Sequence, residues 1–320
     1  MNRYMILGAV GALLSLGCSH RKAPVAHVPG GVRATMTRQV ENAVEVGEGD
    51  YQLQQLRKRM AAEPSNLDIR LELASRYESM GFDEVALEHY RLAAHRFPDH
   101  AGVELRLTRS LHQHGMTSQA LQSVTGFLRA HSNSKYSDLQ SWTGILSDEL
   151  GDWKGGEKYH RAAIAQADQP GSSLYNNLGH NLLRQGQKKE AIEALRTALE
   201  RDSRNEVARN NLGIALASNS SSNSKEAVMQ WQGQSDPASA HSNLAAVLIE
   251  EGRYQQAREE INIALGYKPD HPAALKNLAL VSELDGRPAV VEKREPPKSF
   301  WGRVGSTMGK LFWTPEESTR

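Results

Sequence analysis

The sequence predicts an all-α fold, built as one elongated array of helical hairpins. Ala, Leu, Glu, Gln and Arg dominate the middle of the chain, and aromatic residues make up only 6% of it, a composition that suits helices packed through small side chains. Two segments, 178–200 and 244–266, align with each other without a gap. No stretch between residues 65 and 286 reads as an exposed linker, so one array fits better than two separate domains.

The two aligned segments read LGHNLLRQGQKKEAIEALRTALE and LAAVLIEEGRYQQAREEINIALG. Both resemble the tetratricopeptide repeat, a 34-residue pair of antiparallel helices with Leu-Gly or Leu-Ala at positions 7 and 8, Gly at 15, and Ala at 20 and 27. Small residues at positions 8, 20 and 27 let the helices approach closely, and Gly at position 15 lets the chain leave the first helix. The resemblance implies a right-handed superhelical solenoid.

About six copies of this pattern follow one another along the chain. The fifth copy is interrupted by the run Ser218–Ser224, whose Ser and Asn side chains compete with helix formation. Because stacked hairpins bury their faces only against neighbours, we expect an additional capping helix at each end. The solenoid is therefore predicted over 50–286, with repeats at about 67–100, 101–134, 137–170, 172–205, 206–237 and 238–271, and with caps at 51–62 and 273–284.

The N-terminus has the features of an export signal over residues 1–18. Arg3 is followed by an apolar run that is too short to span a bilayer comfortably, and the run ends at Gly17-Cys18. The ending LLSLGC resembles a lipoprotein box, which implies that the Cys18 sulfur is lipidated and that Cys18 becomes the mature N-terminus. The alternative is an ordinary signal peptide, or a short anchor, that happens to contain a cysteine.

Residues 19–49 are rich in Pro and Gly without a sustained apolar period, which predicts a flexible tether. The residue after the cysteine is Ser19. It stands in place of the Asp that resembles the inner-membrane retention signal of enterobacterial lipoproteins. We therefore expect a cell-envelope protein that is lipid-anchored to the outer membrane and faces the periplasm.

Composition argues against several classes of function. The chain has 38 Lys and Arg against 37 Asp and Glu, so it has no bulk charge with which to attract nucleic acid. A single cysteine excludes a multi-cysteine metal site, and the sequence has no HExxH motif, Ca²⁺ loop or phosphate loop. We predict no metal, no cofactor, no small-molecule substrate and no catalytic residues. An enzyme on a helical-repeat body would need a catalytic constellation that the sequence does not show.

In the tetratricopeptide family, the first helix of each hairpin lines the concave groove, chiefly through positions 2, 5, 9 and 12. The resemblance therefore implies a protein or peptide partner bound in that groove. In the first copy these positions are Asp68, Leu71, Ser75 and Glu78. Our candidate groove residues in the later copies are Asn176, His180, Asn210, Ile214 and Ser242.

Asparagine recurs at two neighbouring positions of the first helices. Asn176 and Asn210 occupy position 5, where an amide can both donate to and accept from a peptide backbone. The amides at position 6 fit a structural role better, because they can bond to the backbone of an adjacent helix and fix the packing. This structural ladder comprises Asn177, Asn211, Asn243 and Asn277.

Residues 287–320 form a Pro-rich charged spacer and an amphipathic tail. Most of the apolar residues in the tail fall on one side of a helix. Three interpretations stay open: docking to a partner or membrane, folding back onto the solenoid, or disorder. The candidate docking residues are Phe300, Trp301, Val304, Met308, Leu311, Phe312 and Trp313.

These features together indicate a non-enzymatic, lipid-anchored scaffold that mediates protein-protein interactions in envelope complex assembly. By its architecture the chain resembles the tight-adherence pilus assembly lipoproteins and the pilotin-like proteins of secretion systems. The alternative is an accessory protein that docks a cell-wall enzyme or a polysaccharide exporter. Both alternatives depend on architecture alone.

Overall fold

The computed structural model describes residues 50–219, 223–233 and 235–290 of the 320-residue chain. This part contains 14 α-helices and no strand, which confirms the predicted all-α fold. The predicted signal segment with Cys18, the tether over 19–49 and the aromatic tail lie outside the described residues.

The chain divides into two compact units between Gln185 and Gly186. The first unit contains α3 (Tyr51–Ala62), α4 (Leu67–Ser79), α5 (Asp83–Arg96), α6 (Ala101–Gln113), α7 (Thr117–Ala130), α8 (Ser137–Glu149), α9 (Trp153–Gln166) and α10 (Ser172–Arg184). The second contains α11 (Lys188–Arg201), α12 (Glu206–Asn219), α13 (Ser224–Gln232), α14 (Pro237–Glu250), α15 (Tyr254–Tyr267) and α16 (Pro272–Asp285).

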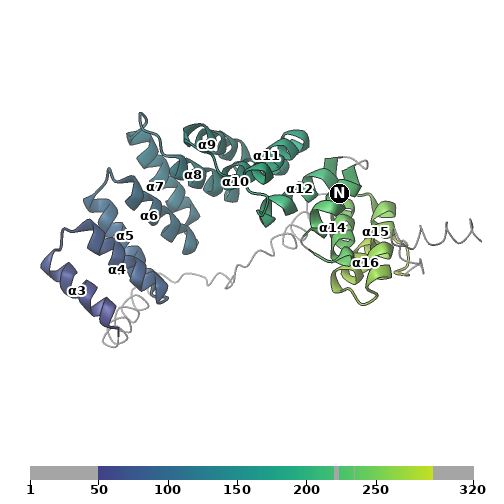
Figure 1. Ribbon diagram of the computed structural model, residues 1–320, viewed down its shortest axis with the longest axis horizontal. Helices are drawn as coiled ribbons and strands as arrows, with labels where there is room; N and C mark the ends of the chain where they lie inside the picture. The colour runs from purple at the N-terminus through teal and green to yellow at the C-terminus, as the bar shows by residue number, and fades with distance from the viewer. Residues whose placement is uncertain (1–49, 220–222, 234, 291–320) are drawn as a thin grey trace, which may run out of the picture. The chain divides into compact units, whose positions relative to one another are not determined.

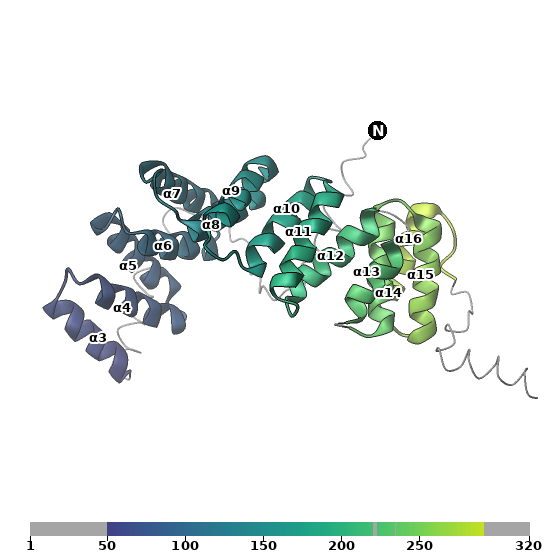
Figure 2. The same ribbon diagram turned by 45° about the horizontal axis from the view of Figure 1, so that its top comes forward.

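Within each unit, helices that follow one another along the chain also pack against one another, as Figures 1 and 2 show for the stack from α3 to α7. The pairs α4–α5, α6–α7 and α8–α9 are the hairpins of the first unit, and α12–α13 and α14–α15 are hairpins of the second. α13 has nine residues whereas α15 has fourteen, so the fifth hairpin has a shortened second helix.

A glycine in the left-handed region turns the chain within the hairpins α4–α5, α6–α7, α8–α9 and α14–α15. Gly81, after α4, has φ +79°, which costs a residue with a Cβ atom far more than it costs glycine. The Gly81 amide donates to the Glu78 carbonyl at 3.0 Å, and the Phe82 amide donates to the Tyr77 carbonyl at 2.9 Å. These two bonds form a Schellman motif, which satisfies carbonyls that the helix end would leave free.

Small residues lie where the two helices of a hairpin meet. Ala74 of α4 and Ala93 of α5 are both 0% exposed. In the hairpin α12–α13, a Cβ atom on Gly213 would lie 2.5 Å from the Trp231 ring, so only glycine allows this approach. The small residues expected from the repeat pattern are therefore buried, and at Gly213 the small residue lies at a close contact between the two helices of a hairpin.

The hairpin α8–α9 encloses a polar cluster that reaches α10. His160 is 1% exposed, and its Nε2 lies 3.0 Å from Asp148 Oδ2. The Asn181 amide donates to Asp148 Oδ1 at 2.6 Å and to the Trp153 carbonyl at 2.8 Å. A Cβ atom on Gly156 would overlap the Asp148 carboxylate, so this glycine provides the space for the cluster.

Gly156→Ala should therefore destabilise the protein by about 1 to 3 kcal/mol, because the added methyl group must displace a buried, hydrogen-bonded carboxylate. Gly126→Ala is the matched control: Gly126 is exposed within α7, and a Cβ atom there meets nothing within 4 Å. The control should gain about 0.5 to 1 kcal/mol from helix propensity. Urea denaturation of both variants measures the difference, and equal effects would show that the space at Gly156 is not limiting.

Candidate functional site

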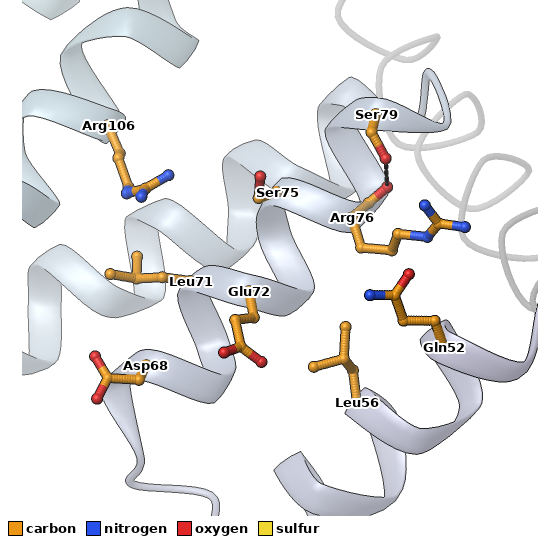
Figure 3. Close-up of a pocket in the computed structure, with 9 residues that line it drawn as sticks. All are labelled: Gln52, Leu56, Asp68, Leu71, Glu72, Ser75, Arg76, Ser79 and Arg106. Atoms are coloured by element: carbon orange, nitrogen blue, oxygen red, sulfur yellow. Dashed lines mark hydrogen bonds between the residues drawn. The ribbon is translucent and has the colours of Figure 1, made fainter.

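A groove of about 620 Å³ opens between α3, α4 and α6 in the first unit (Figure 3). α4 supplies most of its surface, α3 closes one side, and a single arginine reaches in from α6. The lining residues are Gln52 and Leu56 of α3, Asp68, Leu71, Glu72, Ser75, Arg76 and Ser79 of α4, and Arg106 of α6.

Three of these residues occupy the repeat positions that the family resemblance assigns to ligand binding. Asp68, Leu71 and Ser75 are positions 2, 5 and 9 of the first copy, and they follow one face of α4 because each is three or four residues from the next. Asp68 and Ser75 are exposed, and Leu71 is half-buried. Three of the groove positions of α4 therefore line the groove.

Two ion pairs fix α3 against α4 at the edge of the groove. Arg76 pairs with Asp50, which also caps α3 by accepting from the Leu53 amide at 2.8 Å. The Leu53 amide, and then Arg76, lower the pKa of the Asp50 carboxyl. Arg59 Nη1 lies 3.1 Å from Glu72 Oε2. The other two charged residues of the groove, Asp68 and Arg106, take part in neither of these ion pairs.

Aromatic side chains pack within the hairpin α4–α5. The Tyr77 hydroxyl accepts from Arg57 Nε at 2.9 Å, and its ring stacks on His89 at 5.6 Å between centroids. The Tyr90 hydroxyl donates to Glu78 Oε2 at 3.1 Å. Burial, and then Glu78, raise the pKa of Tyr90 to about 12, so the phenol stays protonated and keeps this bond at physiological pH.

The groove positions of the second copy add cationic and aromatic groups. Arg109 and His112 are positions 9 and 12 of α6, and both approach the half-buried Trp142 of α8. The Arg109 guanidinium lies 5.6 Å from the Trp142 ring centroid, and the His112 ring lies 5.4 Å from it. His112 Nε2 also lies 2.7 Å from Glu149 Oε1. Sequence reasoning did not single out Trp142.

The candidate groove residues of the later copies are less accessible than the repeat register suggested. In the first unit, Asn176 is only 9% exposed, whereas His180 is exposed and its ring lies 6.4 Å from that of Trp153. In the second unit, Asn210 Oδ1 accepts from Trp231 Nε1 at 3.0 Å, and Ile214 is half-buried.

Ser242 requires a correction, because it is 1% exposed and cannot reach a ligand in this conformation. Its hydroxyl and its carbonyl both accept from the Asn277 amide, at 3.2 and 2.9 Å. The serine thus belongs to the packing between α14 and α16. Its assignment to a groove failed because the repeat register gives the direction of a side chain but not what the next helix places over it.

Two of the position-6 amides make hydrogen bonds that join neighbouring first helices, as a structural role requires. Asn277 donates to Ser242, and Asn177 lies 3.4 Å from the Ser141 hydroxyl, to which its amide donates. In both cases the bond runs from position 6 of one first helix to position 5 of the preceding first helix. Asn211 and Asn243 are both half-buried on α12 and α14.

Within the described ranges, no three His, Cys, Asp or Glu side chains are grouped so as to hold a metal ion. None of the helices in those ranges is both long enough and apolar enough to cross a membrane.

Comparison with known proteins places the fold among tetratricopeptide repeat proteins. Family models described as tetratricopeptide repeat match residues 172–205 and 242–290. A tetratricopeptide repeat protein from Parabacteroides merdae superimposes with a TM-score of 0.50 and 14% identity, over 78% of this chain and 99% of that one. No curated protein matches the sequence significantly.

Two further solved structures are similar to the chain. The Cut9–Hcn1 hetero-tetramer of APC/C has a TM-score of 0.52 and 17% identity, over 72% of this chain, which spans only 46% of that chain. YrrB, a tetratricopeptide repeat protein with an unusual peptide-binding site, has a TM-score of 0.46 and 21% identity, over 58% of this chain and 96% of that one. The family-model matches and the two structures with TM-scores of 0.50 and 0.52 show that the described part of the chain has the fold of a tetratricopeptide-type helical array.

The half-buried His89 of α5 predicts a pH dependence of stability. Burial, and then Arg70, lower the pKa of His89 from 6.5 to about 4. The unfolded chain therefore takes up this proton before the folded chain does, so stability is complete above pH 6.5 and is lost as the pH falls from 6.5 towards 4. His89→Phe keeps a ring to stack on Tyr77 and removes the titration.

Urea denaturation at pH 7 and pH 4.5 should show wild type losing about 2 kcal/mol more than His89→Phe does, since one pKa unit corresponds to about 1.4 kcal/mol. An equal loss in both proteins would mean that His89 does not titrate with folding.

Proposed function

We propose that this chain is a non-enzymatic, lipid-anchored scaffold that holds a segment of a protein partner in the groove between α3, α4 and α6. The observation that carries the proposal is that Asp68, Leu71 and Ser75 line a groove of about 620 Å³. Those residues stand at the repeat positions through which tetratricopeptide proteins contact their ligands.

The chemistry of the lining favours an extended peptide segment. Leu56 and Leu71 provide apolar surface for one side chain of the partner. Asp68 and Arg106 offer one charge of each sign, and Ser75 can bond to a peptide backbone of any sequence. We therefore expect a partner segment with an apolar anchor residue flanked by charged residues.

The anchor is proposed from the sequence at Cys18. Acyl chains on this cysteine would give the multiple insertion signals that stable membrane attachment needs, because one chain alone binds only marginally. With the tether over 19–49, the array would stand off the membrane surface. An exported, anchored scaffold fits assembly of an envelope complex, such as pilus or secretion machinery, at the periplasmic face of the outer membrane.

Crosslinking in living cells tests the proposal. A photo-crosslinking amino acid in place of Ser75 should capture one specific protein. The same group in place of Leu92, which is 53% exposed on α5 and does not line the groove, should not capture it. Adding Leu71→Glu should reduce capture at position 75 by about fivefold or more, because a carboxylate would replace the apolar contact at a cost of about 1 to 3 kcal/mol.

Fractionation of the same cells tests the anchor. Wild type should follow the outer membrane, and Cys18→Ala should release the protein while leaving its helix content unchanged. Equal capture from positions 75 and 92 would contradict the groove assignment, and continued membrane fractionation of the Cys18→Ala variant would contradict the anchor.

A further inference from the structure

The last helix of the described chain ends in the same way as the first helix of a hairpin. Gly286, directly after α16, has φ +71°, and Gly252, between α14 and α15, has φ +72°. Each glycine is followed by arginine, Arg287 and Arg253. Counted from Pro272, Gly286 is at the turn position of the repeat. α16 therefore has the register of the first helix of a hairpin, and no second helix for it lies among the described residues.

The face of α16 that a second helix would cover is exposed among the described residues. Ala279 is at repeat position 8 and is exposed, whereas Ala245 at the same position of α14 is 0% exposed beneath its hairpin partner. Leu275, one turn before Ala279, is 43% exposed. Terminal repeats normally present a polar outer face to water, so an apolar end face needs a cover.

A hollow of about 340 Å³ lies beside this end, where α15 and α16 run side by side (Figure 2). Asn262 of α15 and Leu278 of α16 line its inner side, and Pro288 and Val290 line another side. Val290 is 63% exposed, which adds to the uncovered apolar surface. The end of the second unit thus offers a partly apolar recess.

Arg258 of α15 holds the chain beside this recess as it leaves α16. Its guanidinium donates to both Asp285 carboxylate oxygens at 2.8 and 2.9 Å, to the Arg287 carbonyl at 2.9 Å and to the Pro288 carbonyl at 3.1 Å. The hydrogen bonds from Arg258 are the main cause that lowers the pKa of Asp285 to about 2. The chain therefore reaches Val290 next to the open face.

We propose that the amphipathic tail, residues 300–313, folds onto this end of the second unit and covers the α16 face as an irregular second helix. The tail carries the apolar residues that such a helix needs, at helical spacing. The nine residues 291–299 can span about 30 Å when extended, which exceeds the roughly 21 Å length of a helix such as α16 with 14 residues.

This inference does not depend on the groove of the first unit or on the anchor.

Disulfide mapping in the full chain tests the proposal. Cys18→Ser removes the native thiol, Ala279→Cys places one thiol on the open face, and a second thiol is placed in turn at Val304, Ser306, Met308 or Lys310. The tail is part of the same chain, so its thiol has a millimolar effective concentration near α16 even without docking. The test is therefore how the disulfide yield varies with position along the tail, and not whether a disulfide forms. Ala273→Cys is the matched control, since Ala273 is exposed on the same helix but turned about 120° away.

Docking predicts intramolecular disulfides from position 279 to Val304→Cys or Met308→Cys at about tenfold the yield for Ser306→Cys and Lys310→Cys, because disulfides form only at short Cβ separations. The control at position 273 should show no such alternation. Equal yields along the tail would overturn the proposal. Disulfide-linked dimers through position 279 would overturn it in favour of a second copy, and no reaction at any position would overturn it in favour of a tail engaged elsewhere, such as on a membrane.

Discussion

The close approach of the two helices within each hairpin is the constraint from which the other features follow. At Gly213 the α12 backbone comes so near to Trp231 that a single added carbon would collide with the ring. At Ala74, Ala93 and Ala245 no side-chain surface remains exposed. Because the two helices of a hairpin lie so close together, the first helix of one copy can lie directly beside the first helix of the next copy. The spacing of the repeat positions along the surface is set by that contact.

The same close helix packing explains both the groove between α3, α4 and α6 and the exposed face of α16. α3 and α4 lie close enough for Arg76 to pair with Asp50, and the shared edge leaves a hollow lined by Leu56, Leu71 and Arg106. At the other end of the described chain, Ala279 of α16, the small residue of the pattern, is exposed. This exposed face is the one on which we propose that the tail docks.

The fold could be predicted from the sequence because the small residues, the turn glycines and the helix-forming composition all require the same structure. Asp68, Leu71 and Ser75 followed from that register. Their groove did not, because it also depends on Gln52 and Leu56 of a helix that lies outside the repeats. Exposure was the weakest inference: Ser242 occupies a groove position by register, yet Asn277 covers it, and an Asn210 oxygen is bonded to Trp231. Such covering depends on neighbouring helices.

A double-mutant cycle at Gly213 and Trp231 tests the central constraint most directly. Gly213→Ala should cost about 1 to 3 kcal/mol in wild type, because its methyl group would lie 2.5 Å from the Trp231 ring. In a Trp231→Leu background the smaller side chain leaves room, so the same substitution should cost nothing or gain slightly from helix propensity. A coupling energy of about 1 kcal/mol or more between the two sites would support the account. Additive effects would contradict it, because the approach of the helices would then not limit the packing.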